Sequence, residues 1–332
     1  MTLCTAWIRQ SNNTEELVFA TDSTLTGGEK WDNGIKLFEL PRKDCLLCFA
    51  GSTFRAYPLI LNLVSSIKFN TYLSKPETDI TEVLNYISDL FTNLIKTIVS
   101  EIQGEDIHEL RSGAKFLFGG WCWQSSSFRI WHLYYSGDAE GFLFKELTSD
   151  DTKTRFYTFL GDPQEAVEKE AKDRFKKLLM EEDKYDSKLN MEPLFILRDI
   201  ALDKTIREVG GSLQIAKVYK SGRSEFFGIL WPSSQGKPYF QGREYNDYNK
   251  PRIKYLNPDT CELMDLEVPK KLNELAEYNF GMFSDLIAEC YPEGKLKDNI
   301  SEKERHILKS VIQEITYSEF VKETEKQEEE AE

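Results

Sequence analysis

Four residues among the first fifty-one could together cleave an amide bond: Thr2, Asp22, Lys36 and Gly51. A threonine hydroxyl becomes a nucleophile when a base takes its proton, and the residue's own α-amine can be that base once Met1 is removed. An α-amine titrates at about 7.7–8.0, so a usable fraction is free base near neutral pH. A neighbouring Lys36 ammonium would lower that pKa, and an Asp22 carboxylate would hold the ammonium charged and in place.

Gly51 lies at the junction between a predicted apolar strand and a predicted helix. The run 45–50 is apolar, Ser52 and Thr53 are good helix N-caps, and the apolar positions after them keep helical spacing. A backbone N–H at such a junction can face the oxygen that becomes negative during acyl transfer. Loss of one such hydrogen-bond donor typically lowers turnover by about 10²–10³-fold. Phe49 and Thr53 flank Gly51, so we predict that they form the wall of a substrate pocket.

The elements that must position these residues are four short strands. Runs 2–9 and 16–22 are apolar and β-branched, with turn-forming residues at 11–14, and runs 34–40 and 45–50 flank a second turn at 41–44. Run 45–50 is apolar on both faces, which predicts a strand covered on both sides.

In order and approximate spacing, this stretch resembles the proteolytic β-subunits of the proteasome and, more widely, the N-terminal-nucleophile hydrolases. The resemblance rests on Thr2 opening the first strand, residues 20–23 closing the second, residues 34–40 as the third, and residues 49–51 closing the fourth. It implies a nucleophile at Thr2, a supporting pair at Asp22 and Lys36, an oxyanion donor at Gly51, and assembly as a homo-oligomer or with a partner subunit.

Periodicity along the chain predicts four strands, two helices, about four strands, two helices and two strands between residues 2 and 231. The predicted helices are 79–103, 163–180 and 192–208, together with the one after Gly51. Strands that are apolar on both faces are buried when two stacked sheets have helices outside both. We therefore predict an α+β protein with a four-layer αββα sandwich over residues 1–231, as the resemblance also implies.

Two further segments follow the predicted sandwich. Residues 232–236 have the composition of a linker, and residues 232–322 are expected to form a mixed or helical extension, with helices near 270–288 and 301–322. Residues 323–332 form an acidic tail, which is more often a solvated end than a binding site.

The resemblance also implies a Ser and an Asp from the second half of the chain around the nucleophile's amine. Asp162, in the corner 161–163, is the candidate accessory residue. The corner 208–211 has no Ser before its glycines, which leaves Asp203 and Arg207 as distant alternatives.

Composition excludes several other functions. With 42 Lys+Arg against 56 Asp+Glu, the formal net charge of −14 would repel a nucleic acid. We find no apolar run that could cross a bilayer and no leader, so a cytoplasmic protein without a membrane partner is expected. The six cysteines are expected to be buried free thiols, and Cys45 and Cys48 should point to opposite faces of one strand, so neither a metal nor a cofactor is expected. His108, His132 and His306 show no arrangement with Ser and Asp of a serine-hydrolase kind.

The sequence thus predicts a threonine-type hydrolase that cleaves peptide or amide bonds through Thr2 after Met1 is removed. Two alternatives stay open. The chain could be an inactive scaffold or partner-binding subunit in which Asp22 and Lys36 are a structural ion pair, or a narrow amidase that uses Thr2 on a small molecule.

Overall fold

The computed structural model describes two compact units, Met1–Asn246 with Lys250–Glu262, and Asp247–Asn249 with Leu263–Glu332. The residues that it describes are 2–11, 14–27, 29–75, 77–100, 104, 106–147, 156–161, 166–184, 188–245, 253–263, 281–290, 297, 300, 301, 303–305, 307, 308, 310 and 311. The candidate residues near the start of the chain all belong to the first unit.

The first sheet of this unit contains the start of the chain. Its strand order is β10-β1-β2-β11-β12-β13-β14, and β15 pairs with β12. The strands are β1 (Leu3–Ser11), β2 (Thr14–Thr21), β10 (Tyr157–Gly161), β11 (Gln214–Tyr219), β12 (Arg223–Trp231), β13 (Lys237–Phe240), β14 (Arg243–Glu244) and β15 (Tyr255–Leu256). β1 and β2 form the predicted hairpin, in antiparallel register from Cys4 opposite Thr21 to Ser11 opposite Thr14. β2 then pairs with β11, so strands from the two halves of the chain lie side by side.

The second sheet is antiparallel throughout and follows chain order, β5-β6-β7-β8-β9. Its strands are β5 (Leu37–Glu39), β6 (Cys45–Gly51), β7 (Ala114–Cys122), β8 (Ser127–Ser136) and β9 (Gly141–Glu146). β6 is buried almost throughout, as its two apolar faces predict. A separate two-stranded hairpin, β3 (Leu25–Thr26) and β4 (Lys30–Trp31), lies between β2 and β5 in the chain.

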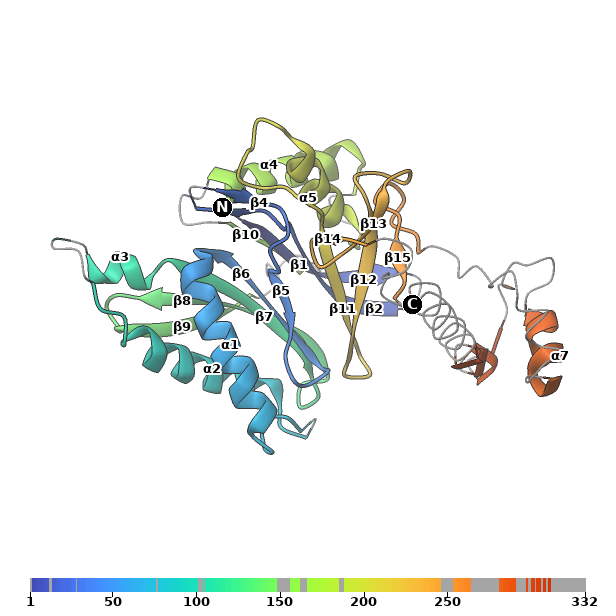
Figure 1. Ribbon diagram of the computed structural model, residues 1–332, viewed down its shortest axis with the longest axis horizontal. Helices are drawn as coiled ribbons and strands as arrows, with labels where there is room; N and C mark the ends of the chain where they lie inside the picture. The colour runs from blue at the N-terminus through green and yellow to red at the C-terminus, as the bar shows by residue number, and fades with distance from the viewer. Residues whose placement is uncertain are drawn as a thin grey trace, which may run out of the picture. The chain divides into compact units, whose positions relative to one another are not determined.

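Helices pack against both sheets (Figure 1). The helices of the first unit are α1 (Thr53–Phe69), α2 (Ile80–Ile95), α3 (Ile107–Arg111), α4 (Ala166–Glu181) and α5 (Glu192–Leu202). α1 begins directly after β6 with Ser52 as its N-cap residue, and the Asp79 side chain caps α2 by accepting a hydrogen bond from the Thr81 N–H. Figure 1 shows α1 and α2 along the sheet that contains β6, and α4 and α5 beside β10 and β1.

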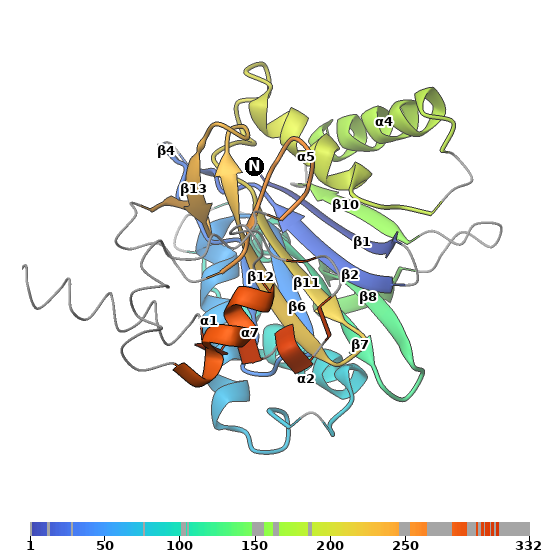
Figure 2. The ribbon, with the colours of Figure 1, turned by 90° about the vertical axis from the view of Figure 1, so that its right-hand side faces the viewer.

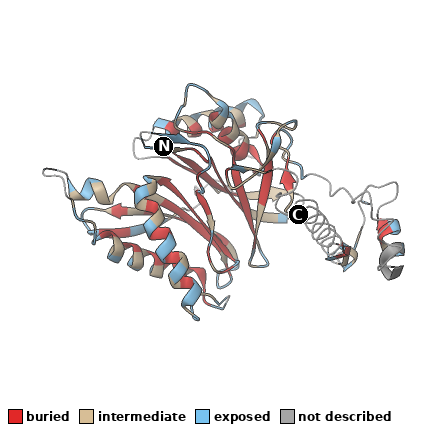
Figure 3. Cartoon of the chain, viewed as in Figure 1, coloured by how far each residue is buried: buried red, intermediate tan, exposed pale blue. Residues whose placement is uncertain are grey.

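Three groups of buried apolar residues show which surfaces these elements cover. One joins β6–β9 to α1 and α2, for example Phe49 with Leu63. A second joins the first sheet to α4 and α5, for example Leu3 with Leu197. The third lies between residues of the two sheets, for example Cys4 with Cys48. Figure 2 shows the strands of the two sheets from a second side, and Figure 3 shows the buried residues concentrated along them. The protein is a mixed α+β structure with antiparallel sheets.

Several predicted elements are shorter than the sequence pattern indicated. The helix expected over 79–103 ends at Ile95, and the helix expected over 192–208 ends at Leu202. At this second end the Asp203 carboxylate accepts hydrogen bonds from the backbone and hydroxyl of Thr205, which turns the chain out of the helix. The strand expected over 34–40 is reduced to Leu37–Glu39, because the backbone of its first part bonds to a side chain from β11, as described below.

The second unit contains α7 (Gly281–Cys290). Most of the helices expected near 270–288 and 301–322, and the whole acidic tail, lie outside the described residues. None of the helices in the described part of the chain has the length and apolar character needed to cross a membrane. The predicted domain boundaries at 231 and 322 stay predictions.

Candidate active site

Asp22 is the centre of the candidate site. It follows β2, and neither its side chain nor that of Lys36 is exposed. Its Oδ1 accepts hydrogen bonds from Lys36 Nζ at 2.9 Å and from the Leu3 N–H at 3.1 Å. Its Oδ2 accepts from the Thr24 and Gly210 N–H groups, each at 3.1 Å. One carboxylate therefore joins the start of β1, the end of β2, the segment before β5 and the segment before β11.

Lys36 is among the largest fully buried side chains of the protein. A buried ammonium is costly unless it is paired and hydrogen-bonded, and Asp22 is its partner. Because Lys36 and Leu3 donate to the same oxygen, the ammonium lies beside the peptide group that follows Thr2. The structure therefore brings together three of the predicted residues, Thr2, Asp22 and Lys36.

Gln214 on β11 holds the backbone that carries Lys36. Its Oε1 accepts the N–H groups of Lys36 at 3.0 Å and Leu37 at 3.2 Å, and its Nε2 donates to the Gly34 carbonyl at 2.6 Å. Gln214 is 1% exposed. Sequence reasoning missed this role, although a polar amide at the start of a mainly apolar strand is a signal that could have indicated it.

Thr2 lies just before β1 and is 2% exposed. Two positions later, the Cys4 thiol donates to the Phe49 carbonyl on β6 at 2.9 Å and to Thr21 Oγ1 at 3.3 Å. This contact crosses from one sheet to the other, and it brings the start of β1 against the end of β6. Alternate residues of a strand face the same side, so Thr2 shares the face of Cys4 that looks toward the second sheet.

Gly51 ends β6 with φ +106°, a conformation that side-chain-bearing residues rarely adopt. A Cβ at this position would lie 2.4 Å from the Gly113 carbonyl oxygen. The Ser52 N–H donates to that oxygen at 2.7 Å, whereas the Phe49 N–H donates to the Lys36 carbonyl at 3.3 Å on the opposite side. Since N–H groups alternate in direction along a strand, the Gly51 N–H points to the side of Lys36 rather than to β7.

The two residues predicted to form a substrate pocket occupy different environments. Phe49 is fully buried and packs its ring against Phe38 and Tyr57. Thr53 is half-buried at the start of α1. Tyr57, on the same helix, donates its hydroxyl to the Ile35 carbonyl at 3.0 Å, so α1 also braces the segment that leads to Lys36. Substrate binding by Phe49 and Thr53 stays a prediction.

The predicted accessory residue Asp162 lies outside the described residues. From the second corner, Gly210 contributes its backbone N–H to Asp22, and Asp203 pairs with Arg174 at 2.7 Å. Ser212 follows the glycines instead of preceding them, and its buried Oγ is without a hydrogen-bond partner in the described part of the structure. Cys4 and Gln214 both lie opposite Thr21, so Thr2 and Ser212, each two positions earlier, share one face and one end of the sheet.

The cysteines are all free thiols. Cys45 belongs to the helix-facing core and Cys48 to the core between the sheets, so the two point to opposite faces as predicted. Burial raises the pKa of both thiols well above the ordinary value. Within the ranges that the structure describes, His, Cys, Asp and Glu residues form no cluster of three or more that could hold a metal ion.

Comparison with known proteins gives similarity to solved structures only. No protein-family model and no curated protein matches the chain. Anbu (ancestral beta-subunit) from Yersinia bercovieri is 16% identical, covers 68% of this chain and 86% of its own, and has a TM-score of 0.43. The Anbu (Gly-1) mutant from Hyphomicrobium sp. strain MC1 is 14% identical, covers 68% of this chain and 88% of its own, and has a TM-score of 0.45.

These findings correct one expectation from the sequence. The chain was assigned to the N-terminal-nucleophile hydrolase superfamily on its resemblance to proteasome β-subunits, and that assignment is wrong: the similarity found is to Anbu proteins, and it is weak. At this identity and TM-score, the likeness carries no residue role or activity over to this chain.

Proposed function

We propose that the protein is an amide hydrolase in which Thr2, once it is the first residue, is the nucleophile and its α-amine the base. The observation that carries this proposal is the buried Lys36–Asp22 pair, whose carboxylate oxygen also accepts the N–H of Leu3. An ammonium beside the first peptide group would lower the pKa of the Thr2 α-amine through the repulsion of like charges. We propose in addition that the chain forms four layers, helix–sheet–sheet–helix, and the three groups of buried apolar residues support this arrangement.

In the proposed reaction the Thr2 hydroxyl oxygen attacks the carbonyl carbon of the amide while its proton passes to the α-amine. The carbonyl oxygen becomes negative and accepts the Gly51 N–H, which points to the side of Lys36. The intermediate collapses with cleavage of the C–N bond, and the departing nitrogen takes the proton from the α-ammonium. An ester to Thr2 is left. Water, deprotonated by the same amine, then releases the acid and restores the hydroxyl.

A second candidate, a non-catalytic scaffold, is favoured by the way in which Asp22 is satisfied. Its two oxygens accept three backbone N–H groups and one ammonium, from four separate segments of the chain. A buried carboxylate with this many donors is also what a purely structural junction between segments requires. The two functions differ in whether Thr2 reacts.

The test is covalent capture by a β-lactone acyl probe on a chain whose first residue is Thr2, as checked by intact mass. We expect one acyl group per chain, located on Thr2 by peptide mapping. Thr2→Ala should abolish labelling, Thr2→Ser should retain it, and the control Thr14→Ala, at an exposed threonine, should label like the parent. A folded chain that starts at Thr2 and takes no label would establish the scaffold instead. Hydrolysis of unrelated peptides or only of small amides then separates a peptidase from a narrow amidase.

A further inference from the structure

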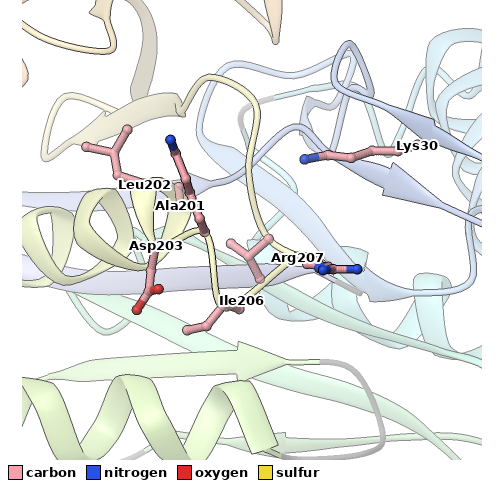
Figure 4. Close-up of a pocket in the computed structure, with 8 residues that line it drawn as sticks. Lys30, Ala201, Leu202, Asp203, Ile206 and Arg207 are labelled. Carbon is pink, nitrogen blue, oxygen red and sulfur yellow. The ribbon is translucent and has the colours of Figure 1, made fainter.

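A surface pocket of about 310 Å³ lies beside the end of α5, on elements that the proposed chemistry does not use. Figure 4 shows Lys30 reaching in from β4, while Asp203, Ile206 and Arg207 come from the segment that follows the helix. The lining residues are Lys30, Ala201, Leu202, Asp203, Lys204, Ile206, Arg207 and Val209.

The pocket is positively charged in a protein whose formal net charge is −14. Lys30, Lys204 and Arg207 are all exposed cations on its wall. Among the residues that the structure describes, neither Lys204 nor Arg207 forms an ion pair. Lys30 lies 3.7 Å from Asp32, and both side chains are more than half exposed, which makes this pair weak.

Asp203 is the one carboxylate among the described residues of the pocket wall, and it is already engaged. Asp203 accepts hydrogen bonds from the Thr205 hydroxyl and N–H and from Arg174 Nη2 at 2.7 Å. These contacts, with the Thr205 hydroxyl first, lower the pKa of Asp203 to about 2. Arg174, which lies outside the pocket lining, also pairs with Glu170 at 2.6 Å, so it offsets the Asp203 charge only in part, and the three cations of the described lining still outnumber this carboxylate.

The remaining lining residues are apolar: Ala201, Leu202, Ile206 and Val209. A cavity that combines an apolar wall with a few charged groups is typical of sites for small organic ligands. We propose that this pocket binds a small carboxylate attached to an apolar group, with Arg207, Lys204 and Lys30 as the anion-binding residues. Arg207 can bind a carboxylate through two parallel N–H···O hydrogen bonds, whereas each lysine contributes a single positive charge.

The pocket is joined to the candidate active site through the backbone. Val209 on its wall precedes Gly210, whose N–H donates to Asp22, and a Cβ added to Gly210 would lie 3.6 Å from Lys30 Nζ. A ligand that contacts Val209 would therefore contact the residue next in the chain to Gly210, which donates to the buried Asp22. The binding site is inferred from the pocket alone and does not rest on the proposed function.

The rival explanation is that Lys204 and Arg207 only complement the negative end of α5 and stay solvated. Titration calorimetry on the full chain distinguishes the two, with N-acetyl-leucine as the probe. Its amide, N-acetyl-leucinamide, has the same apolar body without the charge, and inorganic phosphate has charge without the apolar body. We expect N-acetyl-leucine to bind at least about tenfold more tightly than either, as charge-assisted hydrogen bonds and apolar burial together require.

Arg207→Gln should weaken binding of N-acetyl-leucine by about tenfold and Lys204→Gln by a few-fold, since each removes a charged donor. Lys75→Gln, which changes an exposed lysine after α1, should leave binding unchanged. Thermal unfolding of each variant shows whether it is folded. If Arg207→Gln does not fold, Lys204→Gln still tests the proposal. Equal binding of acid and amide, loss through Lys75→Gln alone, or no binding at tens of millimolar would overturn the proposal. Since no hydrolysis is measured, the result is independent of Thr2.

Discussion

Gln214 accepts a hydrogen bond from the backbone N–H of Lys36 at 3.0 Å, although 178 positions separate the two residues. The same side chain donates to the Gly34 carbonyl and accepts from Leu37, so it fixes the whole segment that presents the buried ammonium. The segment thus follows a side chain from β11 instead of continuing as a strand. This places the cation of the candidate site under the control of the second half of the chain.

Replacing Gln214 by Leu should therefore destabilise the fold and displace Lys36. Two backbone N–H groups and one carbonyl would lose their partner inside the protein, and each buried unsatisfied group costs about 1–3 kcal/mol. We expect the free energy of unfolding in urea to fall by a few kcal/mol. Gln10→Leu, which removes a partly buried side-chain pair with Glu15, should cost less than about 1 kcal/mol. Equal losses would show that Gln214 is not the brace described.

Lys36→Met should cost about 3–5 kcal/mol in the same measurement, because it leaves the buried Asp22 carboxylate without its cation. Lys177→Met is the matched control: Lys177 pairs with Glu181 on α4 with both side chains mainly exposed, and its loss should cost about 0–1 kcal/mol. A small effect of Lys36→Met would mean that Asp22 is satisfied by its backbone donors alone.

Gly51→Ala tests whether this glycine is needed for its backbone conformation and for the space around it. The new Cβ would meet the Gly113 carbonyl oxygen at 2.4 Å and would sit at φ +106°. Gly222→Ala, in the turn between β11 and β12, shares the positive φ but has its nearest atom at 3.8 Å. We expect Gly222→Ala to lower stability by about 1 kcal/mol and Gly51→Ala by clearly more, from strain plus clash. Similar melting temperatures for the two variants would refute the clash.

Ser212→Ala should leave stability within about 0.5 kcal/mol of the parent or raise it slightly, because its buried hydroxyl is unpartnered in the described structure. Ser224→Ala, which removes a hydrogen bond of 2.8 Å to Glu39, should cost about 1 kcal/mol. If the proposed hydrolysis is detected, a drop in rate in Ser212→Ala without a change in melting temperature would add Ser212 to the site. A large loss of stability would show that the hydroxyl has an undetected partner.

His132 should make the fold sensitive to acid. Burial, followed by the charge of Lys115, lowers its pKa from 6.5 to about 4. Between these values the unfolded chain binds a proton that the folded chain does not, so stability rises with pH across this window. The contribution of the neutral His132 imidazole to the free energy of unfolding is complete above about pH 6.5 and is lost as the pH falls toward 4. It is on the order of 3 kcal/mol.

The measurement is urea unfolding from pH 4 to 7.5. His132→Phe should reduce the difference in the free energy of unfolding between pH 4 and pH 6.5. His108→Phe, which removes a histidine hydrogen-bonded to the Tyr135 hydroxyl, is the control for the loss of an imidazole elsewhere. An unchanged pH profile in His132→Phe would assign the acid sensitivity to other groups.

The sequence by itself determined the local elements and the places of the candidate residues along them. Apolar, β-branched runs on either side of a turn predicted the β1–β2 hairpin, the run that is apolar on both faces predicted the buried β6, and the junction before Ser52 placed Gly51 at a strand end. These features depend on backbone periodicity and turn chemistry, which act over a few residues and are therefore visible in a single chain. The same periodicity overestimated the helix lengths, since apolar spacing alone does not show where a polar side chain such as Asp203 turns the backbone out of α5.

Only the tertiary structure decided which of these residues meet. The donors to Asp22 lie up to 188 positions from it in the chain, and neither the roles of Gln214 and Gly210 nor a basic pocket after α5 were predicted, although Asp203 and Arg207 were named as distant accessory alternatives. Such contacts are selected by how the two sheets and their helices pack, and a polar residue in an apolar strand does not indicate by itself which distant group it will satisfy. The burial of Lys36 follows from the same packing, because an ammonium is kept inside only where a carboxylate from another segment is already held in place.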